Sequence, residues 1–478
     1  MERNQELRLC IETVASDGRA VARADRYVVF VDGGTTGDLL DVRIRRVRRR
    51  YAEAEILALV KPGPERSAPR CPYAGLCGGC QWQHIDYRAQ LELKRQHVVD
   101  ALERIGGFEH PTVDPVVGMS DPYYYRNKME FSFGDRWMER AELESVREEQ
   151  PASGERFALG LHIPQRFDKV LDVEECYLQS EQSTRIVNLV RSFARERALP
   201  AYSTVRHQGY LRNLVIRQSR HAAELMVNIV TSEDRPEVMG ELRAVLLEGV
   251  PEITTICNNI TTRKSQVALG EQERVVYGPG FITERLGRWQ FRISANSFFQ
   301  TNTLQTELLY EAVRRAAEAT PAETVYDLYS GTGTIAIVLA ADARSVVGIE
   351  SSSAAIEDAL GNASLNGINN CTFIAGDLAE KFTRQTDWMA QLGLPDVVVL
   401  DPPRAGVHQK VLAELERIGP RRIVYVSCNP ATQARDLQLL CARGRYRIEQ
   451  LQPFDMFPHT RHVENIATLQ KASKNPLN

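Results

Sequence analysis

Residues 326–340 read YDLYSGTGTIAIVLA, and this stretch decides the fold of the second half of the chain. We expect an apolar strand that ends at Tyr329, a tight turn at Gly331 and Gly333, and a helix directly afterwards. Glycines in such a turn let the backbone approach a ligand at the helix N-terminus. The next expected strand ends at Glu350, and an acid there can accept both hydroxyls of a ribose. The stretch alone fits NAD(P), S-adenosylmethionine, or glycines that serve only tight packing.

From about residue 304 onward, short apolar strands alternate with helix-forming segments. The candidate strands are TVYDLY, SVVGIE, CTFIAG, DVVVLD, RIVYVS, YRIEQLQPF and ENIATLQ. Such alternation predicts a parallel, doubly wound α/β sheet. Ligands of these sheets bind at the carboxyl ends of the strands, so polar residues at strand ends are the candidate site.

Two later strand ends carry unusual residues. DVVVLDPPRAG places Asp401 at the end of the fourth strand, followed by two prolines and Arg404. Methyltransferases that act on exocyclic amines often have an aromatic residue at the position of Arg404, which argues against amine methylation. The fifth strand, VYVSCNP, ends at Cys428, and Asn429 and Pro430 suit the start of a helix. A thiol beside a helix N-terminus has its thiolate favoured. A cysteine after such a strand is more often a core residue, but at one sheet edge with the glycine turn and DPPR, Cys428 is a candidate nucleophile.

The segment PFDMFPHTRHVENIATLQ leads into the last strand. Glu464 precedes the apolar run IATL, so we expect its carboxyl group to be partly buried. A partly buried carboxyl group has a raised pKa and can accept a proton, although a paired structural glutamate is the alternative. His459 and His462 fit ordinary loop histidines equally well.

Three of the nine cysteines lie within ten residues in CPYAGLCGGC. The odd number and uneven spread argue against a disulfide scaffold and favour a reducing cytoplasm. Metal chemistry is then the leading interpretation, with Cys176 as a fourth ligand to Cys71, Cys77 and Cys80. Structural zinc usually uses two tight pairs, so the three-plus-one spacing favours an iron–sulfur cluster over zinc.

The first 60 residues contain short β-branched runs separated by Asp-Gly turns, which predict a small β-barrel similar to an OB fold. Residues 43–50 read RIRRVRRR, with six arginines. They predict contact with nucleic acid, although a solvated charged face is the alternative. Because the net charge is 59 − 62 = −3, any such surface must be local. Residues 61–70, KPGPERSAPR, suggest a linker.

No apolar run approaches the roughly 18 residues of a membrane span, and the N-terminus is too polar for a signal peptide. We therefore expect a cytoplasmic protein without a membrane partner. Aromatic and basic residues alternate in DPYYYRNKMEFSF (121–133), which suggests bases stacked on tyrosines. Arg212 and Arg217 are further candidates for RNA contact.

The motifs NSFFQ (296–300), DLYSGTGTIA, DPPRAG, SCNP and PHTRHVE, in this order, closely resemble the RNA uracil-C5 methyltransferases. The resemblance continues upstream through GYLRNLVIRQ and LGLHIPQRFDKVLDVEEC to the barrel, which that family calls a TRAM domain. It implies a multi-domain α/β protein of three parts. These are an RNA-binding TRAM barrel at 1–62, a central α+β domain with the cysteine cluster at 71–300, and a Rossmann-like class I methyltransferase domain at 301–478.

The resemblance also implies roles for individual residues. The nucleophile falls on Cys428 and the general base on Glu464. Contacts to S-adenosylmethionine fall on Gln300, Tyr329, Glu350 and Asp401, with Gly331 and Gly333 in the turn. Relatives with this cysteine motif carry a [4Fe–4S] cluster, which falls on Cys71, Cys77, Cys80 and Cys176. One departure is Tyr329-Ser330, where relatives often have Phe-Cys; an aromatic residue keeps the first position.

The expected activity is S-adenosylmethionine-dependent methylation of a uridine at C5 in structured RNA. The combination of TRAM barrel and cysteine cluster resembles the 23S rRNA enzymes, and tRNA is the alternative substrate. Cytosine-C5 methylation is disfavoured because DPPRAG lacks a cysteine. A non-catalytic RNA-binding or electron-carrying iron–sulfur protein is the alternative of another class. Nothing in the sequence demands a protein partner, so we expect a monomer.

Overall fold

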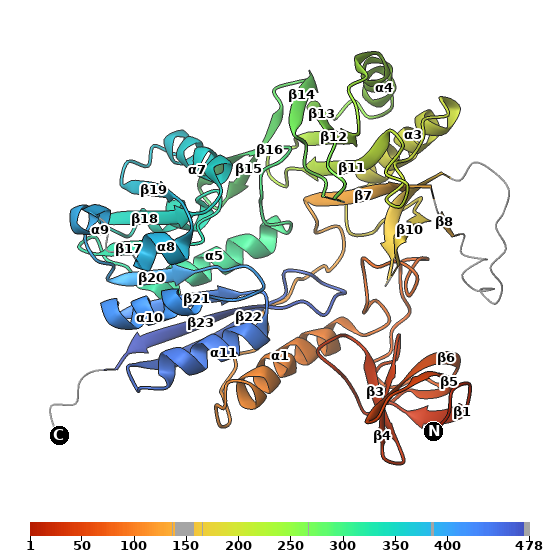
Figure 1. The fold of residues 1–478 in the computed structure, drawn as a ribbon, viewed down its shortest axis with the longest axis horizontal. Coiled ribbons are helices and arrows are strands. Elements are labelled where there is room, and N and C mark those ends of the chain that lie inside the picture. Colours follow the sequence, from red (N-terminus) through yellow and green to blue (C-terminus); the bar gives the residue numbers. More distant parts are fainter. Residues whose placement is uncertain (136, 139–156, 165, 266, 384–386, 473–478) are drawn as a thin grey trace.

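The computed structural model describes the 478-residue chain except for residues 136, 139–156, 165, 266, 384–386 and 473–478 (Figure 1). Its N-terminal sheet has the strand order β1-β5-β6-β4-β3-β2, and β1 also contacts β3, so the two edges approach each other in a barrel-like form. The strands are β1 (Glu6–Cys10), β2 (Thr13–Val14), β3 (Ala20–Ala24), β4 (Tyr27–Val31), β5 (Leu39–Val47) and β6 (Tyr51–Lys61).

The strand β5 alternates between the barrel core and solvent, as a half-buried strand should. Leu40, Val42 and Ile44 are fully buried, whereas the arginines at positions 45, 46, 48, 49 and 50 are exposed. The segment after β6 is fastened to the barrel, because Arg66 forms an ion pair of 2.6 Å with the buried Asp38. The predicted linker is therefore held against the N-terminal sheet.

The middle of the chain forms an eight-stranded sheet in the order β14-β13-β12-β11-β7-β9-β10-β8. Its strands are β7 (Lys128–Gly134), β8 (Trp137–Met138), β9 (Ala158–Ile163), β10 (Arg166–Asp172), β11 (Leu211–Gln218), β12 (Leu225–Thr231), β13 (Thr255–Ile260) and β14 (Gln272–Tyr277). The helices α3 (Glu181–Glu196) and α4 (Pro236–Gly249) pack against each other and contribute to its core. A hairpin of β15 (Phe281–Leu286) and β16 (Trp289–Ser294) leads to α5 (Thr303–Ala317).

The last part is a seven-stranded sheet in the order β19-β18-β17-β20-β21-β23-β22. Its strands are β17 (Thr324–Leu328), β18 (Ser345–Glu350), β19 (Cys371–Ala375), β20 (Val397–Leu400), β21 (Arg422–Ser427), β22 (Tyr446–Phe454) and β23 (Glu464–Lys471). The intervening helices are α6 (Thr334–Leu339), α7 (Ser353–Leu365), α8 (Leu378–Thr383), α9 (Asp387–Leu392), α10 (Gln409–Ile418) and α11 (Pro430–Cys441). All seven candidate strands are thus confirmed.

The prediction of a wholly parallel sheet is wrong for its last strand. The strands β17 to β21 are parallel, but β23 pairs antiparallel with both β21 and β22. A loop without a crossover helix joins β22 to β23, and parallel neighbours need such a crossover. This antiparallel end lets residue 464 start a strand at the same sheet edge where residue 427 ends one.

Helices cover both faces of the seven-stranded sheet. One face packs against α5, α6 and α7, and the other against α10 and α11. The helix α1 (Tyr87–Arg104), which precedes the central sheet in the chain, also packs here beside α11 (Figure 1). Among the described residues, no helix combines the length and the apolar character needed to cross a membrane.

Candidate functional site

A cavity of about 1310 Å³ lies at the carboxyl edge of the seven-stranded sheet. Seven of the eight predicted catalytic and cofactor residues line it, namely Gln300, Tyr329, Gly331, Glu350, Asp401, Cys428 and Glu464. They come from the ends of β17, β18, β20 and β21, from the start of β23, and from the segment before α5. The fold thus brings together residues up to 164 positions apart in the sequence.

The eighth residue, Gly333, shapes the turn without lining the cavity. Its φ of +74° is left-handed, and a Cβ there would lie 2.8 Å from the ring of Phe373. Gly331 also has a positive φ, of +52°, but a Cβ at that position would meet open space. Tyr329 has a φ of 67°, which is strained for a non-glycine residue and is typical of functional sites. The glycine turn thus leaves its backbone open to a ligand.

The Glu350 carboxylate is held in place at the end of β18. Its Oε1 accepts hydrogen bonds from the Ser352 amide at 2.9 Å and from the Ser351 hydroxyl at 2.8 Å. Its Oε2 accepts the Gly331 amide at 3.2 Å. An acceptor oriented in this way at the mouth of the glycine turn fits the ribose of an adenosine cofactor.

Cys428 lies between the end of β21 and the start of α11. Asn429 caps this helix through the Ala431 amide at 3.1 Å, and Pro430 occupies its first turn, as predicted. The expectation of a favoured thiolate is wrong for the protein without ligands. Burial raises the pKa of the Cys428 thiol to about 11, with a further contribution from the Glu464 carboxylate, and this outweighs the helix N-terminus.

Three acidic residues at this edge have raised pKa values. Burial raises the pKa of Asp401 to about 7, and burial together with Asp401 raises the pKa of Glu464 well above its usual range. Asp327, in β17, was not selected from the sequence; burial, with a contribution from Asp401, raises its pKa to about 8. The polar residue within the apolar strand TVYDLY was the signal for it.

Arg404 is the second residue that sequence reasoning left without a role. It lines the cavity, and its charge lowers the pKa of both Cys428 and Glu464, against the dominant effect of burial. The Arg404 carbonyl accepts a hydrogen bond from the Asn429 side chain at 3.0 Å, which ties the loop after β20 to the start of α11. The backbone of Arg404 is thereby held beside the candidate nucleophile, while its side chain is exposed.

The segment before α5 is held by hydrogen bonds to its backbone carbonyls. Asn127 donates a hydrogen bond to the Gln300 carbonyl at 2.8 Å, and Arg217 donates to the Ser297 carbonyl. The expectation that Arg212 and Arg217 face RNA is wrong, because both are buried and bind backbone carbonyls. Phe298 is 68% exposed at the cavity rim.

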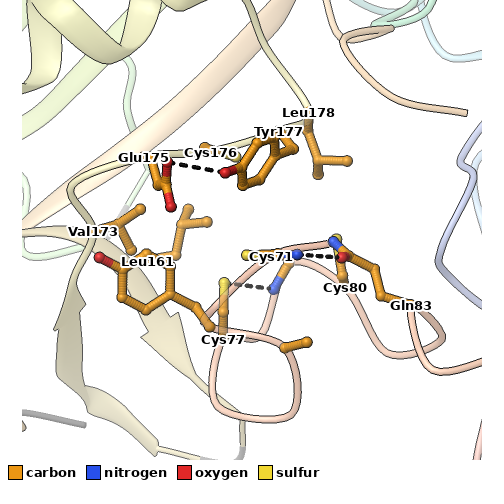
Figure 2. A pocket seen from close by; sticks show the side chains of 13 residues that line it. Cys71, Cys77, Cys80, Gln83, Leu161, Val173, Glu175, Cys176, Tyr177 and Leu178 are labelled. Carbon is orange, nitrogen blue, oxygen red and sulfur yellow. Dashed lines mark hydrogen bonds between the residues drawn. The ribbon is translucent and has the colours of Figure 1, made fainter. Parts of the chain in front are cut away.

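A second, small cavity is lined by Cys71, Cys77, Cys80 and Cys176 together with mainly apolar residues (Figure 2). Three cysteines come from the loop before α1 and the fourth from the segment after β10. The Gly79 amide donates a hydrogen bond to the Cys77 sulfur at 3.3 Å, and Gln83 accepts one from the Cys71 amide. Burial raises the pKa of Cys77 to about 12 and of Cys80 to about 11. Four thiols buried together would need a bound cation before they could ionise.

Within the described part of the chain, no group of three or more His, Cys, Asp or Glu side chains is arranged to hold a metal ion. The four cysteines nevertheless line one cavity. The donor set consists of thiols, which suit zinc and iron–sulfur clusters better than calcium or magnesium.

Comparisons with known proteins identify the family of this chain. Residues 258–472 match the family model described as tRNA (Uracil-5-)-methyltransferase, and residues 1–57 match the TRAM domain. An uncharacterized RNA methyltransferase of Chlorobaculum tepidum is 47% identical over 91% of this chain and 90% of its own length. One from Porphyromonas gingivalis is 43% identical over 96% of this chain and 98% of its own length.

A solved structure is similar over nearly the whole chain. It is the tRNA (uracil-54, C5)-methyltransferase of Pyrococcus abyssi in complex with S-adenosyl-L-homocysteine. The two are 31% identical, with a TM-score of 0.74, over 97% of this chain and 100% of the other. The fold and the site therefore define an S-adenosylmethionine-dependent RNA methyltransferase with an N-terminal TRAM domain and a C-terminal Rossmann-like domain. Within that class, the chain belongs to the RNA uracil-5 methyltransferase family.

Proposed function

We propose that this protein methylates C5 of a uridine in structured RNA, with 23S rRNA as the preferred substrate. The observation that supports the chemistry is the single cavity lined by Cys428, Glu464 and the glycine turn. A nucleophile, a proton acceptor and a cofactor cradle at one sheet edge match the requirements of covalent methyl transfer. The target base must leave its stack to reach this edge.

Cys428 and Glu464 perform the two steps that belong to the protein. Cys428 first loses its thiol proton to solvent. The resulting thiolate bonds to C6 of uracil, and the electrons of the C5–C6 double bond move into the ring as an enolate, which makes C5 electron-rich. S-adenosylmethionine, when bound, supplies the methyl group that C5 takes up. Glu464 removes the proton from C5, the double bond forms again, and Cys428 leaves as a thiolate.

The electrostatics of the cavity support these roles. A carboxylate with a raised pKa is a stronger proton acceptor, and burial raises the pKa of Glu464. Arg404 lowers the pKa of both catalytic groups, so we assign to it the stabilisation of the Cys428 thiolate and of the ionised base.

Four residues are proposed to hold the cofactor. Glu350 would accept the ribose hydroxyls, and the ring of Tyr329 would contact the adenosine. Gln300 and Asp401 would bind polar groups on the other side of the cavity. All four side chains belong to the lining of one cavity, which is the observation that supports this set.

We further propose that Cys71, Cys77, Cys80 and Cys176 hold a [4Fe–4S] cluster. The support is a donor set of four thiols that line one cavity, three of them within ten residues and the fourth distant in the sequence, and such a set would suit an iron–sulfur cluster. Methyl transfer from a sulfonium moves no net electrons, so the proposed role is structural.

The substrate and the setting are proposals as well. The TRAM domain together with the four-cysteine cavity resembles the 23S rRNA enzymes, and residues 1–62, 71–300 and 301–478 are the proposed RNA-binding, central and catalytic domains. The likeness to the Pyrococcus abyssi tRNA enzyme favours tRNA as the second candidate. Mapping 5-methyluridine in rRNA and tRNA of cells with and without the protein distinguishes the two. A cytoplasmic monomer without an obligate protein partner stays a prediction.

RNA that contains 5-fluorouridine tests the chemistry directly. With fluorine at C5 there is no proton for the base to remove, so Cys428 cannot be released. The wild-type protein with S-adenosylmethionine should therefore form a stable covalent adduct that survives denaturing electrophoresis. Cys428→Ala should form none, and Cys441→Ala, a thiol outside the cavity, should react like the wild type. Adduct formation by Cys428→Ala would contradict the proposed nucleophile.

A further inference from the structure

The helix α1 buries polar residues on one face. Tyr87, Gln90 and Lys94 are three and four positions apart, so they lie on the same side of the helix. Gln90 and Lys94 are 0% exposed, although a lysine is almost never fully buried without a partner. The polar residues of this face therefore need a neighbouring segment that supplies hydrogen bonds and a negative charge.

The segment bound there is the β22–β23 loop, residues 455–463, which ends directly before Glu464. Lys94 Nζ forms an ion pair of 2.5 Å with Asp455 Oδ1 and donates a hydrogen bond to the Phe457 carbonyl at 3.0 Å. Tyr87 donates to Asp455 Oδ2 at 2.9 Å. Both charged side chains of this pair are fully buried.

Gln90 binds the same loop four residues further along. Its Oε1 accepts the His459 amide at 2.9 Å, while its Nε2 donates to the carbonyls of Trp82 and Ile85 at 3.0 and 2.9 Å. The His459 carbonyl in turn accepts the Trp82 amide at 3.0 Å. The loop is therefore held at both its start and its middle by the segment around α1.

This anchoring reaches the catalytic cavity. Phe457 and Glu464 both line it, and they lie two and nine residues after Asp455. Among the residues described, none forms a hydrogen bond or an ion pair with the Glu464 carboxylate, so its backbone sets its position. That backbone is held by pairing with Phe454 in β22 and by the loop that closes this hairpin. A buried ion pair is a weak source of stability because desolvation offsets its attraction, but it fixes geometry strictly.

We propose that Lys94 and Asp455 are positioning residues, which hold the β22–β23 loop so that Glu464 meets the proton on C5 of the target base. The inference rests on the proposed function, because it assigns these residues to the proton-removal step of that reaction. Displacement of the Glu464 carboxylate would slow this step alone. The Cys428 thiol, which follows β21 and lies outside the β22–β23 hairpin, would still add to C6.

The experiment compares RNA with hydrogen and with deuterium at uridine C5. In the wild type we expect several steps to share control of the rate, so the isotope effect on kcat should be small. In Lys94→Met, proton removal should become rate-limiting: kcat should fall roughly 10- to 100-fold, part of what a general base contributes, and the isotope effect should rise to a full primary value. The methylated covalent complex should also accumulate on ordinary uridine RNA.

Two further variants separate positioning from folding. Lys94→Met/Asp455→Asn leaves no unpaired buried charge and retains an acceptor for Tyr87, yet still lacks the bond to the Phe457 carbonyl. It should fold better than Lys94→Met and keep the raised isotope effect. Arg422→Met removes another buried cation, which lies at the first residue of β21, whereas Cys428 follows the last residue of that strand. It should lower stability and leave the isotope effect at the wild-type value.

A wild-type isotope effect in both Lys94 variants, with kcat lowered only in proportion to the folded fraction, would overturn the positioning role. If the wild-type protein formed no adduct with 5-fluorouridine RNA, the proposed function and this inference would fall together. An adduct in the wild type combined with an unchanged isotope effect in the variants would reject the inference alone.

Discussion

The reactivity of Cys428 in the free protein offers a quantitative test of the site. Burial raises its pKa from 9.0 to about 11, and the Glu464 carboxylate contributes to the rise. Only the thiolate reacts with iodoacetamide. At pH 8 the thiolate fraction falls from about 10% at a pKa of 9 to about 0.1% at a pKa of 11, so alkylation should be roughly 100-fold slower than for an unperturbed thiol.

Two substitutions should shift this rate in opposite directions. Glu464→Gln removes the carboxylate that raises the pKa of Cys428, so alkylation should accelerate across the pH range in which Glu464 is ionised. Arg404→Gln removes the cation that favours the thiolate, which raises the pKa and slows alkylation. Glu464→Gln should therefore combine faster alkylation with lost methylation. If its stability equals that of the wild type, unfolding does not explain this pattern.

The assay is a series of short iodoacetamide pulses from pH 7 to 11, with peptide mass spectrometry of Cys428. The exposed Cys10 in the same samples reports reagent activity. Half-maximal alkylation of Cys428 below pH 9 in the wild type would refute the reasoning about burial. Equal rates in Glu464→Gln, Arg404→Gln and the wild type would refute the electrostatic coupling of the three groups.

Three further predictions concern other parts of the molecule. Asp327 has a folded pKa above its unfolded value, so its ionisation opposes folding; wild-type stability should fall relative to Asp327→Asn between pH 5 and 8, by roughly 3 kcal/mol in urea unfolding. Gly333→Ala should cost about 1–3 kcal/mol and weaken cofactor binding in calorimetry, because its φ is positive and its Cβ meets Phe373. Replacement of the arginines at 48–50 by alanine should lower RNA affinity and reduce the salt slope by about 0.7–0.9 for each lost phosphate contact.

The positions of the strand ends were predictable because alternating strands and helices place the carboxyl ends at one edge. Glu350, Asp401 and Cys428 each follow an apolar run, and that alone brings them to one cavity. The antiparallel β23 was not foreseen, since a short strand reads the same in either direction. Its consequence matters, because only this direction places Glu464 at that edge.

The electrostatic state of the site could not be derived from the sequence. Helix position favours a thiolate at Cys428, but burial and nearby carboxylates are tertiary effects and they dominate. Arg212 and Arg217 resemble RNA-binding residues in the sequence, yet the folded chain uses them to bind carbonyl groups. The residue pattern of α1 likewise does not predict that Lys94 is buried, because Asp455, the partner of Lys94, lies 361 residues away.

That separation constrains how the protein is made. Lys94 and Gln90 leave the ribosome long before Asp455 and His459, and at about 5–20 residues per second the wait is roughly 20–70 s. Arg461 also reaches back to the Ser16 carbonyl across 445 positions. During translation the polar face of α1 must therefore stay hydrated until residues 455–463 emerge. The position of Glu464 is fixed only after that, so the proposed active site assembles late in relation to α1.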